Sequence, residues 1–208
     1  MAADAVAIRP ALPNDAAGLA MLANALDRDQ GGEGKVHSEA TVLRAAFAAE
    51  PAVRFVVATQ AAEPVGYAMF ARFYNSDTAE TGSYLNDLYV IPALRSAGIG
   101  RRLLAAVAAA TAQAGGSFIW TGVYSANTRA RAFYAALGAR DEDARILELD
   151  GAAFASLARG AEKAAGAGAH PCRRRIASLP WTSRHDPPDN REGASKRPCR
   201  TRRRWRIV

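Results

Sequence analysis

One junction constrains the fold of this 208-residue chain more than any other stretch. An apolar, strand-like run at residues 84–91 passes into the segment Arg95–Arg102, which reads RSAGIGRR. The residues that follow, with Leu103, Leu104 and Val107, have the spacing of an amphipathic helix. A strand, a glycine-containing turn and a helix in this order predict a helix whose first backbone N–H groups have no partner. Such groups attract anions, and the arginines of the segment add positive charge, so we expect a diphosphate ligand.

The two glycines, Gly98 and Gly100, do not form the three-glycine fingerprint of dinucleotide-binding folds, and the Gly-Lys-Ser/Thr of a P-loop is missing. Alone, they would also suit a tight strand-to-helix turn without a ligand. With Arg95 they match Arg/Gln-x-x-Gly-x-Gly/Ala, and here the chain resembles the GNAT superfamily of acetyl-CoA-dependent N-acetyltransferases. The resemblance implies that coenzyme A is held by Arg95, Ser96, Ala97, Gly98, Ile99, Gly100 and Arg101.

A second motif lies downstream, where residues 127–138 resemble the Asn-x-x-Ala-x-x-Phe-Tyr-x-x-Leu-Gly helix of the same superfamily. The spacing of its apolar residues predicts an amphipathic helix, with Gly138 at a left-handed C-cap. Tyr134 is then either a core aromatic or, as the resemblance implies, the acid that protonates the departing thiolate. Asn127 would bind the pantetheine arm or cap the helix.

The general base is the point at which the resemblance stops. Residues 84–90, YLNDLYV, are most similar to the diamine and polyamine acetyltransferase branch, where the proposed base is a Glu at the position of Asn86. An amide cannot accept a proton at neutral pH, so we expect Asn86 to orient the amine or a water molecule. An amine that loses its proton to water before attack would need no base at all.

Strand geometry assigns the neighbours of Asn86 to faces. Regular alternation would place Tyr84, Asn86 and Leu88 on one face and Leu85, Asp87 and Tyr89 on the other. Asp87 should then face away from the thioester and bond to backbone or an arginine. The backbone N–H groups of Leu88, Tyr89 and Val90 would polarise the acetyl carbonyl, as the resemblance implies.

Strands and helices alternate along the rest of the chain, which predicts a mixed α/β fold with a central sheet flanked by helices. The resemblance implies a GNAT-like sheet over about residues 5–158, with a V-shaped gap between the strands at 84–91 and 118–124. We expect one domain at residues 1–160. Its other elements are strands at 6–9, 55–58, 65–70 and 145–149, and helices at 15–26, 38–47, 98–114 and 152–158, with a hairpin around residues 61–64.

Charge divides the chain unequally. Residues 1–165 carry 15 Lys+Arg against 17 Asp+Glu, whereas residues 166–208 carry 12 against 3. The segment 161–208 therefore reads as a small-residue linker followed by a basic, disordered tail. The tail could bind nucleic acid through its arginines and Trp205, target an anionic membrane, or be a frame-shifted extension without a role.

These observations predict an N-acetyltransferase that uses acetyl-CoA as co-substrate and no metal. The acceptor would be a primary amine, small or polyamine-like, and a homodimer remains open. A polyamine would suit an acidic rim, although ordinary surface charge explains the same residues, and His37 is expected at the surface. The acidic residues near predicted loops are Asp27, Asp29, Glu33, Asp77 and Glu80.

Several features point to the cytoplasm. The chain shows no secretory signal and no membrane span, and its cysteines, Cys172 and Cys199, lie in the tail without ligand-spaced partners. The alternative function is a non-catalytic protein that binds acyl-CoA through the same turn, or nucleic acid through the tail.

Overall fold

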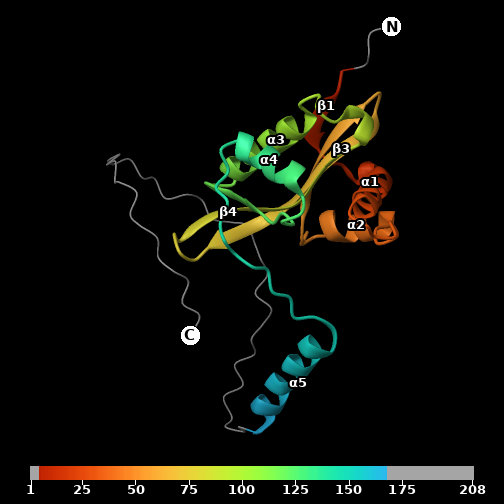
Figure 1. Cartoon of the computed structure of the whole chain (residues 1–208). Helices are drawn as coiled ribbons and strands as arrows, with labels where there is room; N and C mark the ends of the chain where they lie inside the picture. Colours follow the sequence, from red (N-terminus) through yellow and green to blue (C-terminus); the bar gives the residue numbers. More distant parts are fainter. Residues whose placement is uncertain (1–4, 168–208) are drawn as a thin grey trace, which may run out of the picture. The chain divides into compact units, whose positions relative to one another are not determined.

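The computed structural model describes residues 5–167, and the calls on the basic tail, including Trp205, lie outside this range. The described residues divide into two units, one up to Gly151 and the other from Ala152 onward. The first contains a five-stranded sheet in the order β1-β2-β3-β4-β5 (Figure 1). The strands are β1 (Ala7–Pro10), β2 (Arg54–Gln60), β3 (Glu63–Asn75), β4 (Glu80–Val90) and β5 (Ile119–Thr121).

Neighbouring strands pair antiparallel from β1 to β4, and β4 pairs parallel with β5. The predicted mixed sheet is therefore confirmed. The predicted hairpin is also present: Gln60 pairs with Glu63, and the two-residue loop Ala61-Ala62 has positive φ at both positions. Pro64 is tolerated because the register shifts beside it, after Ala58.

Helices cover both faces of the sheet, as Figure 1 shows. On one face lie α1 (Ala16–Asp29) and α2 (Glu39–Ala46), whose apolar sides pack on Val57, Tyr67 and Tyr89. On the other lies α3 (Ile99–Gln113), whose buried residues Ile99, Leu103 and Val107 pack on the opposite side chains of β2 to β4. The other helical elements are η1 (Pro13–Asp15), η2 (Pro92–Leu94), α4 (Thr128–Ala136) and α5 (Gly151–Ala167).

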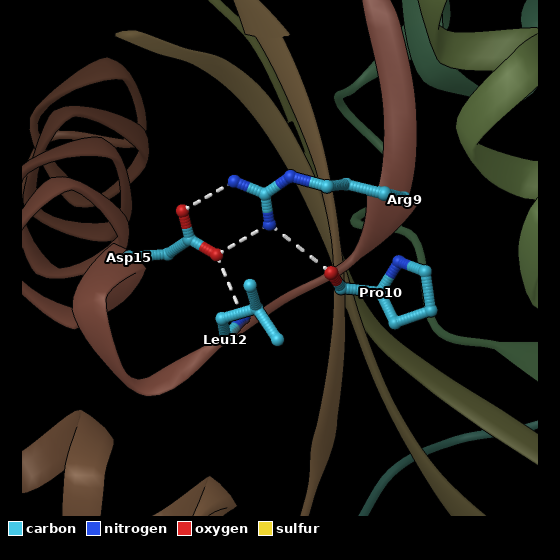
Figure 2. A network of polar contacts seen from close by, with 4 residues as sticks. All are labelled: Arg9, Pro10, Leu12 and Asp15. Atoms are coloured by element: carbon cyan, nitrogen blue, oxygen red, sulfur yellow. Dashed lines mark hydrogen bonds and ion pairs between the residues drawn. The ribbon is translucent and has the colours of Figure 1, made fainter. Parts of the chain in front are cut away.

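A polar network fixes the chain between β1 and α1 (Figure 2). The Arg9 guanidinium donates two hydrogen bonds to the Asp15 carboxylate, at 2.7 and 2.8 Å. The same carboxylate accepts the backbone N–H of Leu12 at 2.7 Å, and Arg9 also reaches the Pro10 carbonyl. The Arg9 bonds are the largest cause that lowers the pKa of Asp15, which burial opposes. Asp15 is therefore a buried charge with its partners in place.

In the C-terminal half one predicted element is absent and two have other bounds than predicted. Residues 145–149 form no strand: no strand of residues 5–167 pairs with them, and Ile146, Leu147 and Leu149 are exposed. The strand predicted at 118–124 is β5, which spans only Ile119–Thr121. The closing helix does not stop at Ala158, because the alanine-rich sequence continues as α5 to Ala167, through the start of the predicted linker.

Candidate active site

The strands β4 and β5 part at the end of the sheet that β5 forms. Their parallel pairing covers only Ser83 to Leu85 on β4, and the Thr121 hydroxyl at the end of β5 donates to the Leu85 carbonyl at 3.0 Å. Beyond this point β4 continues to Val90, and no strand among residues 5–167 pairs with it on that side. The open edge of β4, residues 86–90, is the feature that the predicted V-shaped gap requires.

A β-bulge at Asn86 changes which groups face this edge. On β3, Met69 and Phe70 are consecutive, yet they pair with Asp87 and Leu85, so Asn86 is an additional residue. Ile91 donates its N–H to the Val65 carbonyl, at 3.0 Å. In an antiparallel ladder the hydrogen-bonded pairs alternate, so the backbone of Tyr89 also points to β3. The backbone groups of Leu88 and Val90 consequently point to the open edge.

The bulge also breaks the alternation of side chains that the sequence predicts. Leu85 and Leu88 both belong to the core on the α3 face, whereas Tyr89 packs on the α1 and α2 face. Asp87 contacts Tyr67, a residue of that same α1 and α2 face. The predicted grouping of Tyr84, Asn86 and Leu88 was wrong, because one extra residue reverses the faces of everything after it.

Asp87 lies in a mostly buried setting. The hydroxyl of Tyr67, a fully buried residue, donates to Asp87 Oδ2 at 3.0 Å. Burial raises the pKa of the Asp87 carboxyl, and the Tyr67 hydrogen bond and the nearby His37 oppose that rise. Burial likewise raises the pKa of Tyr67 far above its ordinary value, so Tyr67 remains a donor.

His37 reaches this region from the segment between α1 and α2. Its backbone is held by the side chain of Asn24 on α1, which accepts from the His37 N–H and donates to the His37 carbonyl, both at 2.8 Å. His37 is half-buried. Its backbone is therefore fixed to α1 by a specific contact, and its charge lowers the pKa of Asp87.

Tyr134 approaches from α4. The Asn127 side chain caps this helix by accepting the N–H of Ala130 at 3.0 Å, and Gly138 has the predicted positive φ of 82°. Tyr134 packs against the α3 face of the core, close to Thr121. Burial raises the pKa of Tyr134, a hydrogen bond with Thr121 opposes this, and the Asp87 charge adds to it. The phenol is thus protonated at neutral pH.

The turn after β4 leaves a row of backbone donors without backbone acceptors. Ser96 and Gly98 have positive φ values of 71° and 76°, and Gly98 is the N-cap of α3 without a side-chain cap. The first backbone hydrogen bond of this helix joins the Arg102 N–H to the Gly98 carbonyl. Within the described part of the chain, no backbone acceptor bonds the N–H groups of residues 96–101. This arrangement suits an anion such as a pyrophosphate.

The arginines of the turn have different surroundings. Arg95 forms an ion pair with Asp29 at the end of α1, donates to the Val90 carbonyl at 2.8 Å, and stacks over the Tyr89 ring at 5.3 Å. Arg102 donates to the Val6 carbonyl at 2.8 Å. Arg101 is exposed and makes no ion pair or hydrogen bond with residues 5–167.

A cavity elsewhere in the fold lies apart from the candidate site. A cavity of about 390 Å³ lies between the end of α2, the end of α3 and the start of β2, and its lining includes neither Asp87 nor Tyr134. In the described range, no group of three or more His, Cys, Asp or Glu residues is placed to hold a metal ion. Nor is any helix within residues 5–167 long and apolar enough to cross a bilayer.

Comparison with known proteins agrees with this geometry. Residues 19–139 match the model of the acetyltransferase (GNAT) family. The chain therefore belongs to the GNAT family, and it is an N-acetyltransferase, a class whose acetyl donor is acetyl-CoA. The resemblance seen in the sequence is thus confirmed at the level of the family, and the polyamine branch within it stays a prediction.

Solved structures show the same fold at low identity. An integron cassette protein from the mobile metagenome of V. cholerae aligns with a TM-score of 0.64 and 21% identity, over 74% of this chain and 98% of that one. The aminoglycoside N-acetyltransferase AAC(6')-Iy, in complex with CoA, aligns with a TM-score of 0.60 and 19% identity over 71% and 95%. An aminoglycoside acetyltransferase from an uncultured soil metagenomic sample, in complex with trehalose, aligns with a TM-score of 0.59 and 16% identity. The alignment covers 70% of this chain and 97% of that one.

Asp87 and His37 are the residues whose placement the sequence did not predict. The sequence contains no signal for the bulge, since it arises from the register of two strands far apart in the chain. The Asn24 contact that places His37 likewise joins α1 to a segment 13 residues away.

Proposed function

We propose that the chain transfers the acetyl group of acetyl-CoA directly to a small primary amine. The observation that carries this proposal is the open edge of β4, which ends in a turn whose N–H groups at residues 96–101 lack backbone acceptors. One end of this arrangement suits a pyrophosphate, and the other has a protonated tyrosine, Tyr134, beside the gap.

Coenzyme A would be held mainly by backbone groups. The pyrophosphate would accept the N–H groups of Ser96, Ala97, Gly98, Ile99, Gly100 and Arg101, with the Arg101 side chain as the nearest cation not engaged elsewhere within residues 5–167. Arg95 would support the turn through Asp29 and Val90 rather than bind phosphate with its side chain. Asn127 supports the site by capping α4.

The acetyl transfer would take place at the open edge. The backbone N–H of Leu88 or Val90 would polarise the acetyl carbonyl and stabilise the oxyanion that forms when the amine attacks. Tyr89 would contribute packing, because its backbone belongs to the ladder with β3. When the carbon–sulfur bond breaks, the Tyr134 hydroxyl would protonate the thiolate, and Asn86, exposed at the bulge, would orient the incoming amine.

The contacts of the acidic residues bear on which kind of amine could be the acceptor. Asp27 accepts the Gly34 N–H at 2.7 Å, Asp29 pairs with Arg95, and Glu33 lies 3.7 Å from Lys35. Asp27 and Asp29 are thus engaged within the fold, which leaves fewer free carboxylates for a polyamine than the sequence suggests. We therefore propose a small amine with one reacting nitrogen in place of an extended polycation.

A thiol-release assay tests this proposal. The purified chain is incubated with acetyl-CoA and a panel of primary amines, free thiol is followed with a chromogenic disulfide, and the product is identified by mass spectrometry. We expect thiol release with at least one small amine and none from the Gly100→Asp variant, whose carboxylate would repel the pyrophosphate. Coenzyme A binding without thiol release from any amine would instead establish the non-catalytic acyl-CoA-binding alternative.

A further inference from the structure

The proposed transfer lacks one component, a group that takes the proton from the amine. An alkyl amine is protonated at neutral pH and cannot attack until it loses that proton. Asn86 is an amide and cannot serve. Tyr134, the proposed acid, packs with the core on the α3 face, so we take the amine to approach the thioester from the opposite side of the sheet. A base should therefore be sought on the α1 and α2 face.

Asp87 occupies this position because of the bulge. It follows Asn86 directly, faces the α1 and α2 side through its contact with Tyr67, and is close enough to Tyr134 to raise the pKa of that phenol. The Asp87 charge thus acts on the neutral Tyr134 phenol, the other group that the transfer needs.

One oxygen of Asp87 is held and the other is accessible. Oδ2 accepts the Tyr67 hydroxyl at 3.0 Å, which fixes the plane of the carboxylate. No donor within residues 5–167 bonds Oδ1. Because the described residues contain no fully buried side-chain oxygen without a partner, Oδ1 is not fully buried. A carboxylate with one anchored and one partly exposed oxygen is suited to accept a proton from a bound ligand.

We propose that Asp87 is the general base of this acetyltransferase, replacing the glutamate that is absent at Asn86. This inference rests on the proposed function. The Asp87 carboxylate accepts one proton from the ammonium, directly or through a water molecule, and the freed lone pair forms the nitrogen–carbon bond. The carbon–sulfur bond then breaks, and Tyr134 protonates the thiolate. Tyr134 recovers its proton through water from the nitrogen of the protonated amide that this step leaves, and Asp87 releases one proton to solvent for each turnover.

The groups around Asp87 define its pH dependence. Tyr67 on β3 donates to it, Tyr89 lies beside Tyr67 on the same face, His37 faces it from the segment between α1 and α2, and Tyr134 faces it from α4. Burial raises the pKa of Asp87, which makes the carboxylate a stronger base than an exposed aspartate. Tyr67 is a positioning residue, and its hydrogen bond lowers the same pKa.

The test compares Asp87→Asn with wild type on an accepted amine of high pKa. We expect kcat at pH 7 to fall by about 10²- to 10⁴-fold while KM for acetyl-CoA and coenzyme A affinity stay within about twofold. The residual rate should rise about tenfold per pH unit, because the free amine then forms only in solution. With an accepted amine of low pKa, the fall in kcat caused by Asp87→Asn should be much smaller. Asp77→Asn, an exposed loop variant with the same charge change, is the matched control and should match wild type.

Two further variants separate a base from a structural residue. Tyr67→Phe should move the acidic limb of kcat/KM to higher pH, because it removes the hydrogen bond that lowers the Asp87 pKa. Asp87→Glu should keep measurable base catalysis, and it replaces Asp87→Asn if the latter loses coenzyme A affinity.

The outcomes separate the two hypotheses. If wild type acetylates an amine and Asp87→Asn keeps at least a third of its kcat with the wild-type pH profile, Asp87 is not the base although the function stands. An Asp87→Glu rate equal to that of Asp87→Asn would also overturn the assignment. If wild type releases no thiol with any amine, the proposed function fails and the role of Asp87 fails with it.

Discussion

Adding one methyl group at Gly100 should separate the stability of the fold from its affinity for coenzyme A. Gly100 is the second residue of α3 and does not have a positive φ. A Cβ built there would meet only the Phe133 ring, at 3.7 Å, which is an ordinary contact. Alanine is preferred over glycine in a helix by about 0.5–1 kcal/mol. Gly100→Ala should therefore raise the free energy of unfolding by up to about 1 kcal/mol.

The same methyl group should weaken coenzyme A binding. It would lie among the N–H groups of residues 96–101, where a phosphate must approach the backbone. Losing one hydrogen bond to a charged group costs about 1.5–3 kcal/mol, which corresponds to about a 10- to 150-fold rise in Kd. Isothermal titration with coenzyme A measures the affinity, and urea unfolding of the free protein measures the stability.

Two other glycines provide the controls. Gly98 and Gly138 have φ values of 76° and 82°, and a Cβ at either would meet nothing within 4 Å. Alanine at each should cost about 1 kcal/mol of stability through backbone strain alone. Gly98→Ala should also weaken coenzyme A binding, whereas Gly138→Ala should not. If Gly100→Ala bound coenzyme A as tightly as wild type, the assignment of the turn as a pyrophosphate site would be refuted.

Three further outcomes are expected. Tyr134→Phe should lower kcat by about 10- to 100-fold with coenzyme A affinity unchanged, measured by thiol release, and an unchanged kcat would exclude Tyr134 as the acid. Asp15→Asn should lower the free energy of unfolding at pH 7 by about 1–2 kcal/mol. Solvent screening keeps this loss small, because the Arg9 side chain is 36% exposed. Since the pKa of Asp15 is lowered by folding, this difference should shrink as pH falls below about 4, and a difference constant from pH 7 to pH 3 in urea unfolding would contradict the ion pair. Replacing Ala61-Ala62 by Asn-Gly should raise Tm by about 2–4 °C, because both residues have positive φ, and no rise in calorimetry would show that the turn is unstrained.

Features set by local sequence were predicted well. The helix after Gly98, the cap at Asn127, the left-handed residue Gly138 and the hairpin at 61–64 all depend on residues within a few positions of one another. The N-cap of α2 is of the same kind, since Ser38 accepts the N–H of Thr41 as its position before an apolar run predicts.

Features set by distant pairing were not predicted. An apolar run such as residues 145–149 becomes a strand only if a sheet edge receives it, and the pairing partner cannot be identified from the run itself. The face of Asp87 depends on one inserted residue at Asn86, which only the register against β3 reveals. The local sequence therefore located the turn before α3, whereas regular alternation placed Asp87 on the wrong side of the strand.

The contacts of Arg95 have a consequence for engineering the acceptor range of this enzyme. Its guanidinium joins the C-terminal end of α1, through Asp29, to the last residue of β4. A chimera that takes the α1–α2 region from another GNAT protein would replace Asp29 and leave Arg95 without its carboxylate. The turn after β4, the proposed donor site, would then lose a support although none of its own residues had changed. Any exchange of the α1–α2 region should therefore carry an acidic residue at position 29.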